Sequence, residues 1–313
     1  MGLQVFDTWR DLTPAQGGAA VALGAFDGVH RGHRAVIAAA ATGARALQAP
    51  LGVVTFEPHP RRWFSPDVGP FQITNADQQA RALEALGVER LYRLRFDDAL
   101  AHLSDEAFVR EVLVEGLGVR HVSAGPDIRF GRARTGGPEL LRTYGERFGF
   151  TVAIAPLVIQ AGRKCSSTAI RAALAEGRPE QAAEMLGRPF AIESVVVHGD
   201  HLGRTIGFPT ANMSLGDYIR PAQGIYAART RLSDGREIAG VAYIGRRPTV
   251  NGVDERLEVN LFDFDEDLYG QTLETDLVAF LRGDEKFDGL EAMKAQIARD
   301  CGAARTILLP EIG

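Results

Sequence analysis

The front half of the chain alternates short apolar runs with longer segments whose apolar residues recur at helical spacing. This alternation is typical of a parallel sheet covered by helices on both faces. In such sheets ligands bind at the carboxyl ends of strands, beside helix N-termini. The pattern therefore predicts a doubly wound α/β unit, with strands over 21–24, 51–56, 91–94, 119–124 and 151–154 and helices over 34–47, 75–86 and 108–117.

The pattern changes after two further helical stretches, 168–176 and 179–186. Short strand-like runs separated by turn signals such as Ser233-Asp234-Gly235 then follow, which is typical of a small antiparallel barrel. A final helix carries Leu290, Met293 and Ile297 on one stripe. We expect a domain boundary near residue 187, giving domains 1–186 and 187–313. The strand-like runs cover 195–197, 225–230, 237–244, 257–262 and 273–280.

Composition excludes several classes of protein. The 313 residues are 45% hydrophobic and 24% charged, so the chain can bury enough apolar surface to fold. A net charge of −5 gives no general attraction to nucleic acid. Two cysteines cannot build a disulfide scaffold, and no run is long enough to span a membrane. The N-terminus lacks an apolar signal core, so we expect a cytoplasmic protein. The 35 glycines exceed the usual share and indicate close backbone approaches.

The sharpest local signal is the segment LGAFDGVHRGH, from Leu23 to His33. A strand runs into a glycine-bearing turn and then a helix, with His30 and His33 at the helix entry. Two imidazoles beside the N–H groups of a helix N-terminus form a pocket for phosphates. The alternatives are a metal pair, which would need a third ligand, or two surface histidines. The glycines that would let the backbone approach a nucleotide are Gly24, Gly28 and Gly32.

A second signal is the run Ser166-Ser167-Thr168, which opens a helix and is followed by Arg171. The plainest interpretation is an N-cap. In a functional interpretation the same hydroxyls and N–H groups hold the outer phosphates of a nucleotide. Lys164 next door adds positive charge.

Four motifs in one order resemble the nucleotidyltransferases marked by HxGH. They are GAFDGVHRGH (24–33), TFEPHP (55–60), GPDIRFG (125–131) and SSTAIR (166–171). More closely, they resemble the FMN adenylyltransferase (FAD synthetase) module of the prokaryotic bifunctional riboflavin kinase/FMN adenylyltransferase family. The chain departs from that family at Ile128, where Phe is usual, and at Ala133, where Gly is common. The resemblance implies a Rossmann-like fold for residues 1–186.

The reaction that this resemblance implies is transfer of AMP from ATP to FMN, with release of pyrophosphate. No covalent nucleophile is needed, so the protein supplies position and charge neutralisation. His30 and His33 would hold the phosphates, and Asp127 would position Mg²⁺ or the substrate phosphate. The leaving pyrophosphate would contact Ser166, Ser167, Thr168 and Arg171, while Phe26 and Asp27 complete the nucleotide turn. Phe56, Pro58 and His59 would line the flavin side, unless their stretch is only a rigid proline loop.

The second half carries a glycine-rich stretch, HGDHLGRTIGFPTAN, and no P-loop motif. Thr210 and Asn212 at its end are two residues apart, so in an extended segment they project to one side. Their hydroxyl and amide oxygens suit Mg²⁺ together with nucleotide phosphates. The alternative is a turn with local hydrogen bonds. The residues that would wrap or bind the nucleotide are Gly199, Gly203, Arg204 and Gly207.

The segment LEVNLFDFDEDLYG places Glu258 and Asn260 on one strand face. A carboxylate there can accept a proton from a substrate hydroxyl, although a single Glu on a strand is by default only solvent-facing. Together with the preceding stretch and with GIYA (224–227) and GVAYIGRRPTV (240–250), the segment resembles the riboflavin kinase domain, a six-stranded barrel. Glu258 would then be the base, and Thr210 and Asn212 would hold Mg²⁺ and phosphates.

The departures in this half are Leu202, where Arg is frequent, and Tyr243 and Arg246, where Asn and Thr are usual. The resemblance implies an enzyme that makes FMN and then FAD from riboflavin and ATP. We expect only small-molecule partners, no nucleic acid or membrane, and a monomer or weak homo-oligomer. The rival hypotheses are a riboflavin kinase with a degenerate front module and a flavin-binding regulator without turnover.

Overall fold

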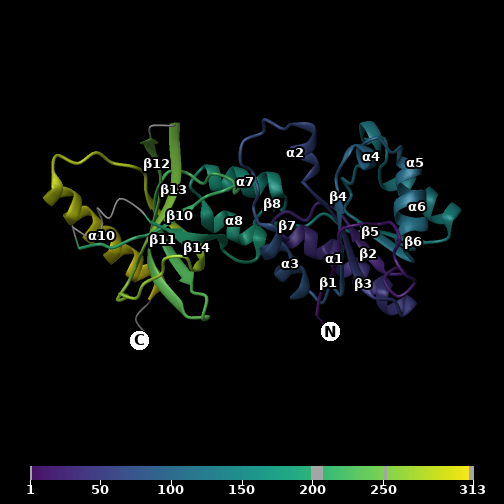
Figure 1. Ribbon diagram of the computed structural model, residues 1–313, viewed down its shortest axis with the longest axis horizontal. Helices are drawn as coiled ribbons and strands as arrows, with labels where there is room; N and C mark the ends of the chain where they lie inside the picture. Colours follow the sequence, from purple (N-terminus) through teal and green to yellow (C-terminus); the bar gives the residue numbers. More distant parts are fainter. Residues whose placement is uncertain (1, 199–206, 250–251, 310–313) are drawn as a thin grey trace. The chain divides into compact units, whose positions relative to one another are not determined.

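The computed structural model describes residues 2–198, 207–249 and 252–309, and the chain packs into two units (Figure 1). The first unit holds the residues up to 69 together with 76–166. The second holds 70–75 and the chain from 167 onward. The expected pair of folds is present, a helix-covered parallel sheet followed by an antiparallel barrel.

The first unit is built on a six-stranded sheet in the order β1-β4-β3-β2-β5-β6, and every neighbouring pair is parallel. The expected strands are present, with ends that shift by a few residues. The edge strand β1 was not expected, because three partly exposed residues give no apolar run. The strands are β1 (Gln4–Phe6), β2 (Ala20–Leu23), β3 (Leu51–Glu57), β4 (Arg90–Arg95), β5 (His121–Ala124) and β6 (Thr151–Ile154).

Alternate residues of β2 face opposite layers of the core. Ala20 and Ala22 pack in a cluster with helix α1 (Arg31–Leu47), whereas Val21 and Leu23 pack with the π-helical segment η1 (Phe108–Gly116). Both sheet faces are thereby covered, which is why the central strand is apolar at every position. The other elements of this unit are α2 (Pro60–Phe64), α3 (Ala76–Glu84), α4 (Asp98–Ala101), α5 (Asp105–Ala107), η2 (Arg132–Arg134), α6 (Pro138–Phe148), β7 (Ile159–Gln160) and β8 (Arg163–Lys164).

The second unit is a closed antiparallel barrel in the order β10-β13-β12-β11-β14-β9. Strand β10 was expected only as the end of a loop, because its four residues, ANMS, are too short a run to predict a strand by themselves. Strands β9 and β13 begin five residues earlier than the sequence predicts, and strands β12 and β14 also extend further. The strands are β9 (Phe190–Val197), β10 (Ala211–Ser214), β11 (Gly224–Arg231), β12 (Glu237–Thr249), β13 (Gly252–Leu261) and β14 (Thr272–Arg282).

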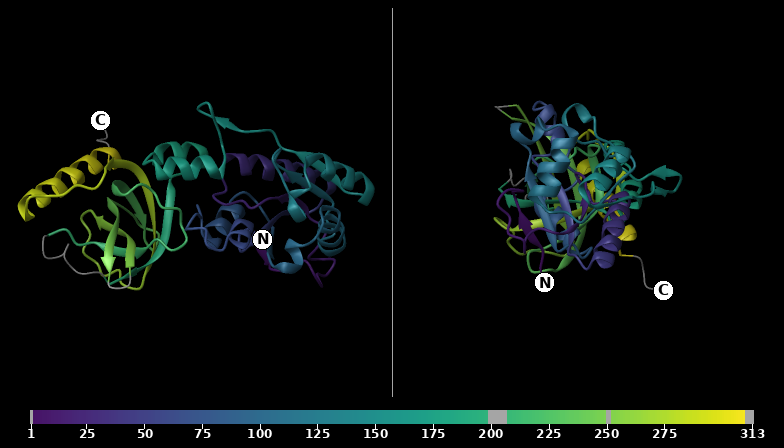
Figure 2. Two further views of the ribbon diagram at one scale, coloured as in Figure 1. Left: turned by 90° about the horizontal axis from the view of Figure 1, so that it is seen from above. Right: turned by 90° about the vertical axis from the view of Figure 1, so that its right-hand side faces the viewer.

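Helices cover the outside of the barrel. Helix α10 (Leu290–Leu308) packs on β11, β12 and β14, where Ala304 and Leu308 meet Ala227 and Val241 (Figure 2). Helix α8 (Pro179–Leu186) packs on β9 and β14 and on α7 (Ser167–Ala175). The barrel interior is filled by the alternate residues of each strand, including Met213, Leu257 and Val259.

The segment 70–75 joins the second unit through backbone hydrogen bonds. The N–H groups of Phe71 and Gln72 donate to the carbonyl of Asp217 at 3.0 and 2.9 Å. The N–H of Ile219 donates to the carbonyl of Gln72 at 2.7 Å. Asn75 adds a side-chain bond to Glu193 of β9 at 3.0 Å.

Candidate functional sites

The turn between β2 and α1 contains three residues in the left-handed region, namely Phe26 (φ 52°), Gly28 (φ 89°) and Val29 (φ 42°). This conformation is unfavourable for a β-branched residue such as Val29 and marks a constrained turn. Burial holds the turn in place, since Phe26 and Val29 are each only 1% exposed. The chain thereby turns sharply at the carboxyl end of a central strand and enters α1.

His30 caps helix α1. Its Nδ1 accepts a hydrogen bond from the backbone N–H of His33 at 3.3 Å, and its ring stacks on His33 with centroids 3.6 Å apart. Phe26 lies against His33 from the other side at 5.1 Å. The two predicted histidines thus lie together where the positive end of a helix dipole favours an anion. No group of three or more His, Cys, Asp or Glu residues in the described parts of the chain could hold a metal, so the metal-pair alternative gains no support.

Gly32 allows a second segment to approach the start of α1. A Cβ at Gly32 would lie 2.9 Å from the carbonyl oxygen of Cys165 and 3.0 Å from Cε1 of His30. The residue before the predicted Ser166 is therefore placed directly against the HxGH turn. Gly24 has a similar role toward the ring of Phe26, 3.3 Å from where its Cβ would be.

Asp127 forms an ion pair with Lys164 of β8, and both side chains are largely exposed. The loop that follows contains Gly131 at φ 71°, Ala133 at φ 57° and Arg134 at φ 60°. A Cβ at Gly131 would lie 2.4 Å from the backbone nitrogen of Asp105, so only glycine fits there.

A carboxylate that sequence reasoning missed holds this loop. Asp105 accepts hydrogen bonds from Tyr144 at 2.9 Å and from Thr135 at 3.1 Å. Desolvation raises the pKa of Asp105, but these hydrogen bonds outweigh it and the pKa lies below its ordinary value. Desolvation and the same contact raise the pKa of Tyr144 to about 12. A single Asp far away in sequence carried no signal of this role.

The predicted flavin residues lie at the end of β3. Phe56 packs edge-on against Phe96 at 5.8 Å and also meets Phe108 at 6.3 Å. His59 caps α2, because its Nδ1 accepts from the N–H of Arg61 at 3.0 Å. Two residues that sequence reasoning missed, Trp63 and Phe64, extend the aromatic cluster onto Phe96, and Phe64 is 66% exposed. Pro58 lies between Phe56 and His59 in the same connection.

Ser167, Thr168 and Arg171 belong to helix α7 of the second unit. Arg171 donates from Nε to the carbonyl of Phe71 at 2.7 Å, and its guanidinium lies 5.3 Å from the centre of the Phe71 ring. Phe71 is buried, so Arg171 holds the segment 70–75 against α7. This structural contact was not expected from the sequence.

The barrel brings together Asn212 and Glu258, which come from two different sequence motifs. Asn212 on β10 is directly opposite Glu258 on β13, and Glu258 is directly opposite Tyr243 on β12. Opposed residues of antiparallel strands share one face, so the three side chains lie on the outer face of the barrel wall. Asn260, next on the same face, donates to the carbonyl of Pro209 at 2.8 Å and holds the PTAN segment.

Asn212 is 6% exposed, and its Nδ2 donates to the carbonyl of Thr210 at 3.2 Å. Its Oδ1 is buried and has no hydrogen-bond partner in the described part of the chain. Thr210 Oγ1 lies 3.5 Å from Asn212 Nδ2. The side chains of Thr210 and Asn212 therefore lie together, and their role as oxygen ligands stays a prediction.

A cavity of about 310 Å³ adjoins Thr210. Its walls include Val196, Leu268 and Tyr269, and the ring of Tyr269 lies 3.9 Å from that of His198. Gly207, at φ 88°, precedes Pro209. The predicted Gly199, Gly203 and Arg204 lie outside the described residues, as does the departure at Leu202.

Two family models match the chain in succession. One described as FAD synthetase matches residues 12–169, and one described as riboflavin kinase matches residues 186–308. Curated relatives named bifunctional riboflavin kinase/FMN adenylyltransferase span nearly the whole chain. The protein of Escherichia coli K12 is 41% identical over 93% of both chains, and that of Pseudomonas fluorescens is 41% identical over 98% of this chain and 99% of its own. That of Bacillus subtilis is 37% identical over 90% of this chain and 89% of its own.

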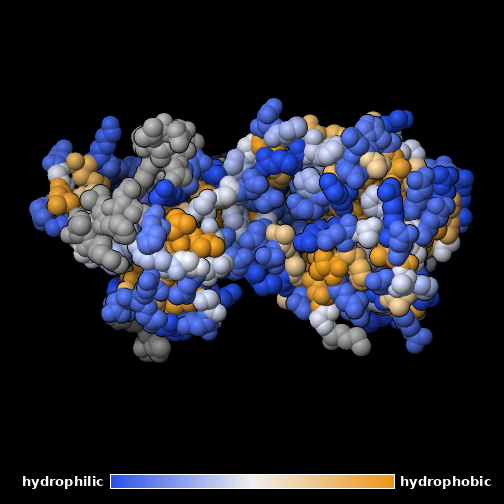
Figure 3. Space-filling view, in the orientation of Figure 1, coloured by the Kyte–Doolittle hydropathy of each residue, from blue (hydrophilic) through white to orange (hydrophobic). Residues whose placement is uncertain are grey.

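A solved structure from Streptococcus pneumoniae, named as a macrolide-efflux protein, matches 97% of this chain and 99% of its own. The TM-score is 0.87 at 32% identity. Among the described residues, no helix has the length and apolarity needed to cross a membrane. Hydrophilic side chains predominate on the face shown in Figure 3, and apolar ones gather there only in small groups. With both family models matched in order and relatives aligned over 90% or more of this chain, the chain belongs to the family of bifunctional riboflavin kinases/FMN adenylyltransferases.

Proposed function

We propose that the barrel unit phosphorylates riboflavin to FMN and that the sheet unit adenylylates FMN to FAD, each with ATP. The observation that carries this proposal is the register of β10 and β13, which sets Asn212 opposite Glu258. A proton acceptor and a buried oxygen ligand on one face are what phosphate transfer to a hydroxyl requires.

In the kinase reaction, Glu258 accepts the proton of the ribityl 5′-hydroxyl of riboflavin. The hydroxyl oxygen forms a bond to the γ-phosphorus of ATP as the bond to the leaving ADP breaks. Thr210 and the PTAN backbone hold the phosphates, and the cavity lined by Leu268 and Tyr269 takes the nucleoside. Gly199, Gly203, Arg204 and Gly207 are proposed to wrap the nucleotide.

We propose Mg²⁺ as the cofactor of both reactions. Asn212 Oδ1, which has no hydrogen-bond partner among the described residues, and the hydroxyl of Thr210 are hard oxygen donors, which suit this ion. When bound, Mg²⁺ neutralises charge on the nucleotide phosphates. In the sheet unit, Asp127 is the proposed residue on the cation or the substrate phosphate, and Lys164 holds its carboxylate.

In the adenylyl transfer, a phosphate oxygen of FMN attacks the α-phosphorus of ATP as the bond to pyrophosphate breaks. His30 and His33 hold the phosphates at the start of α1, where the helix dipole adds to their charge. Gly24, Phe26, Asp27, Gly28 and Gly32 shape the turn that admits the nucleotide. Ser166, Ser167, Thr168 and Arg171 are the proposed contacts of the leaving pyrophosphate.

We infer that the flavin of FMN packs beside Phe56, Pro58 and His59. The partly exposed aromatic cluster of Trp63, Phe64 and Phe96 extends the same surface, and flat rings stack well on a flavin. This placement explains why Phe64 stays exposed in the absence of a covering element.

We place the functional boundary near residue 187, between domains 1–186 and 187–313. We further propose a cytoplasmic enzyme that works on small molecules and binds no nucleic acid, in line with its net charge of −5. A monomer or a weak homo-oligomer is the expected state.

One time course tests the proposal. The pure protein is incubated with riboflavin, ATP and Mg²⁺, and the flavins are separated. We expect FMN to appear before FAD. FMN alone would indicate a degenerate front module, and neither product would indicate a binding protein without turnover.

Two variants assign the activities to the units. Glu258→Gln should lower FMN formation by about 10²–10⁴-fold, the usual contribution of a proton-transfer group. His30→Ala combined with His33→Ala should abolish FAD formation from supplied FMN and spare FMN formation. An unchanged kinase rate in Glu258→Gln would remove Glu258 from the mechanism.

A further inference from the structure

Tyr243, which departs from the family pattern, lies on the same outer barrel face as Glu258. Tyr243 is directly opposite Glu258 on β12, and directly opposed residues have Cβ atoms about 4.5–5.5 Å apart. The side chain of Tyr243 therefore starts next to that of Glu258, the residue that would take the substrate proton.

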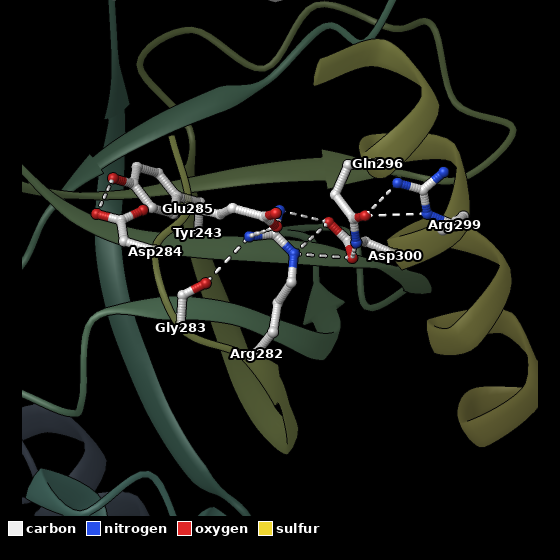
Figure 4. A network of polar contacts seen from close by, with 8 residues as sticks. All are labelled: Tyr243, Arg282, Gly283, Asp284, Glu285, Gln296, Arg299 and Asp300. Carbon is white, nitrogen blue, oxygen red and sulfur yellow. Dashed lines mark hydrogen bonds and ion pairs between the residues drawn. The ribbon is translucent and has the colours of Figure 1, made fainter. Parts of the chain in front are cut away.

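The ring of Tyr243 lies along β12 over Gly245. A Cβ at Gly245 would be 2.1 Å from the hydroxyl oxygen and from Cζ of the ring, so glycine is required for this placement. The hydroxyl donates to Oδ2 of Asp284 at 3.1 Å (Figure 4). Tyr243 thus reaches from the strand face to the segment 283–289.

Asp284 lies two residues after Arg282, which forms an ion pair with helix α10 at the end of β14. Arg282 contacts both carboxylate oxygens of Asp300 on α10, with distances of 3.1 and 2.8 Å, and Asp300 is only 5% exposed. Gln296 also donates to Asp300, at 2.8 Å. The residue two positions before Asp284 is therefore fixed to the helix, as Figure 4 shows.

We propose that Tyr243 is a specificity-determining residue for the acceptor substrate of the kinase reaction and that Asp284 is its positioning residue. A phenol that donates to a carboxylate becomes a better acceptor for another hydroxyl, because linked hydrogen bonds polarise one another. The chemistry that fits this oxygen, beside a base, is a polyhydroxylated chain. Tyr243 accepts from a secondary hydroxyl of the ribityl chain and so aims the terminal hydroxyl at Glu258. This inference rests on the proposed kinase activity of the barrel.

The test compares Tyr243→Phe with the full-length enzyme. A neutral hydrogen bond contributes about 0.5–1.5 kcal/mol, so we expect the riboflavin Kd and KM to rise about 3- to 10-fold. The KM for ATP should stay within about twofold of the wild-type value, because the hydroxyl does not face the nucleotide cavity. Asp284→Ala, an exposed position, should raise the riboflavin KM in the same direction.

The chemical arm uses a flavin whose side chain is 5-hydroxypentyl, which keeps the terminal hydroxyl and lacks the secondary ones. Wild-type enzyme should prefer riboflavin to this analogue, and Tyr243→Phe should lose that preference. The double variant Tyr243→Phe with Asp284→Ala should be no worse than Tyr243→Phe alone, because the two residues act as a unit. Tyr92→Phe, which removes a hydroxyl bond to Gln16 in the sheet unit, is the matched control with unchanged kinase constants.

Riboflavin Kd, measured by quenching of flavin fluorescence without ATP, separates this inference from the proposed function. Wild-type protein that binds riboflavin but makes no FMN would contradict the kinase activity, while the Kd of the variants would still decide the role of Tyr243. Unchanged riboflavin Kd and unchanged preference over the hydroxypentyl flavin in both variants would overturn the inference. An equal loss for both flavins would assign Tyr243 a purely structural role.

Discussion

The oxygen of Asn212 is buried without a hydrogen-bond partner in the described residues, while its amide nitrogen is bonded to Thr210. An unsatisfied buried polar atom costs about 1–3 kcal/mol, so such an atom in a folded protein calls for an explanation. The proposed cation, bound together with nucleotide phosphates, would supply one. On this proposal, the folded chain accepts the cost of an unsatisfied oxygen because the cation later binds to it.

This explanation predicts how Asn212→Ala behaves. We expect the Mg²⁺ concentration for half-maximal kinase rate to rise at least about tenfold, the scale seen when a metal site is perturbed. Thermal stability should change little, because the loss of the Nδ2 bond to Thr210 is offset by removal of the buried, unsatisfied Oδ1. Asn75→Ala is the control, since it loses a bond to Glu193 outside the site and should leave the Mg²⁺ titration unchanged. An unaltered Mg²⁺ titration in Asn212→Ala would contradict the assignment.

Ala133 is a residue whose departure from the family pattern has a visible physical consequence. It lies at φ 57° and ψ 16°, a left-handed conformation that side chains disfavour by roughly 1–2 kcal/mol and glycine does not. The position is exposed, so burial of the alanine methyl group does not offset this cost.

We therefore expect Ala133→Gly to stabilise the protein by about 1 kcal/mol in urea unfolding. Ala38→Gly is the matched control, because Ala38 is exposed in the interior of α1 and glycine there should destabilise by about 1 kcal/mol. Opposite signs for the same substitution would show that backbone conformation decides the effect. A lower free energy of unfolding in Ala133→Gly than in the wild type would contradict the inference that the backbone at Ala133 is strained.

At the scale of elements, helix α1 meets strand β5 at His121. A Cβ at Gly43 of α1 would lie 2.5 Å from the imidazole, so the helix approaches the strand closely only because residue 43 is glycine. Nδ1 of the imidazole bonds to Thr151 of β6 at 2.8 Å, and Nε2 has no partner in the described part of the structure. Burial lowers the pKa of His121 below its ordinary value of 6.5.

The pH dependence follows from this direction. Below pH 6.5 the His121 side chain takes up a proton in the unfolded chain more readily than in the folded chain. The contribution of neutral His121 to the free energy of unfolding is therefore fully present above pH 6.5. It is lost as the pH falls toward the lower pKa of the folded state. We expect His121→Phe to flatten the fall of unfolding free energy between pH 6.5 and 5, measured by urea titrations at each pH. An identical slope in wild type and variant would mean that other groups set the dependence.

At the scale of the whole molecule, the structural units differ from the domains that we propose with a boundary near residue 187. The barrel unit includes helices α7 and α8, which the sequence assigned to the front domain ending at 186. Helix α8 packs on β9 and β14 and buries Met185 and Leu186 to 2% exposure or less. Most of both helices lies between the two family matches, which end at residue 169 and begin at residue 186.

Fragments test this difference. We expect residues 167–313 to be more stable than residues 187–313 by about 3–6 kcal/mol, because burying Met185 and Leu186 contributes roughly 1.5–3 kcal/mol each. Unfolding in urea gives the stabilities, and FMN formation shows whether each fragment is active. Equal stabilities would show that α7 and α8 are dispensable for the barrel.

Much of this protein could be predicted because its signals are local. The apolar run of β2, the turn after it and the helix entry at His30 lie within one short segment, where backbone sterics and capping act between near neighbours. Strands β1 and β10 could not be predicted, since a run of three or four residues is too short to indicate a strand by itself and forms one only when a neighbouring strand pairs with it. The same holds for Asp105, whose partners Thr135 and Tyr144 lie 30 and 39 residues away.

The sequence by itself determined the two fold classes, the order of the units and the residue types that each reaction needs. Only the tertiary structure decided which of these residues meet. The register of β13 with β10 and β12 sets Glu258 between Asn212 and Tyr243, and a shift by one residue would turn Glu258 into the barrel. The contacts of Arg171 with Phe71 and of Tyr243 with Asp284 likewise depend on distant segments. The physical reason is that hydrogen-bonded pairing and packing between distant segments depend on the whole folded chain, whereas propensity and capping depend on adjacent residues.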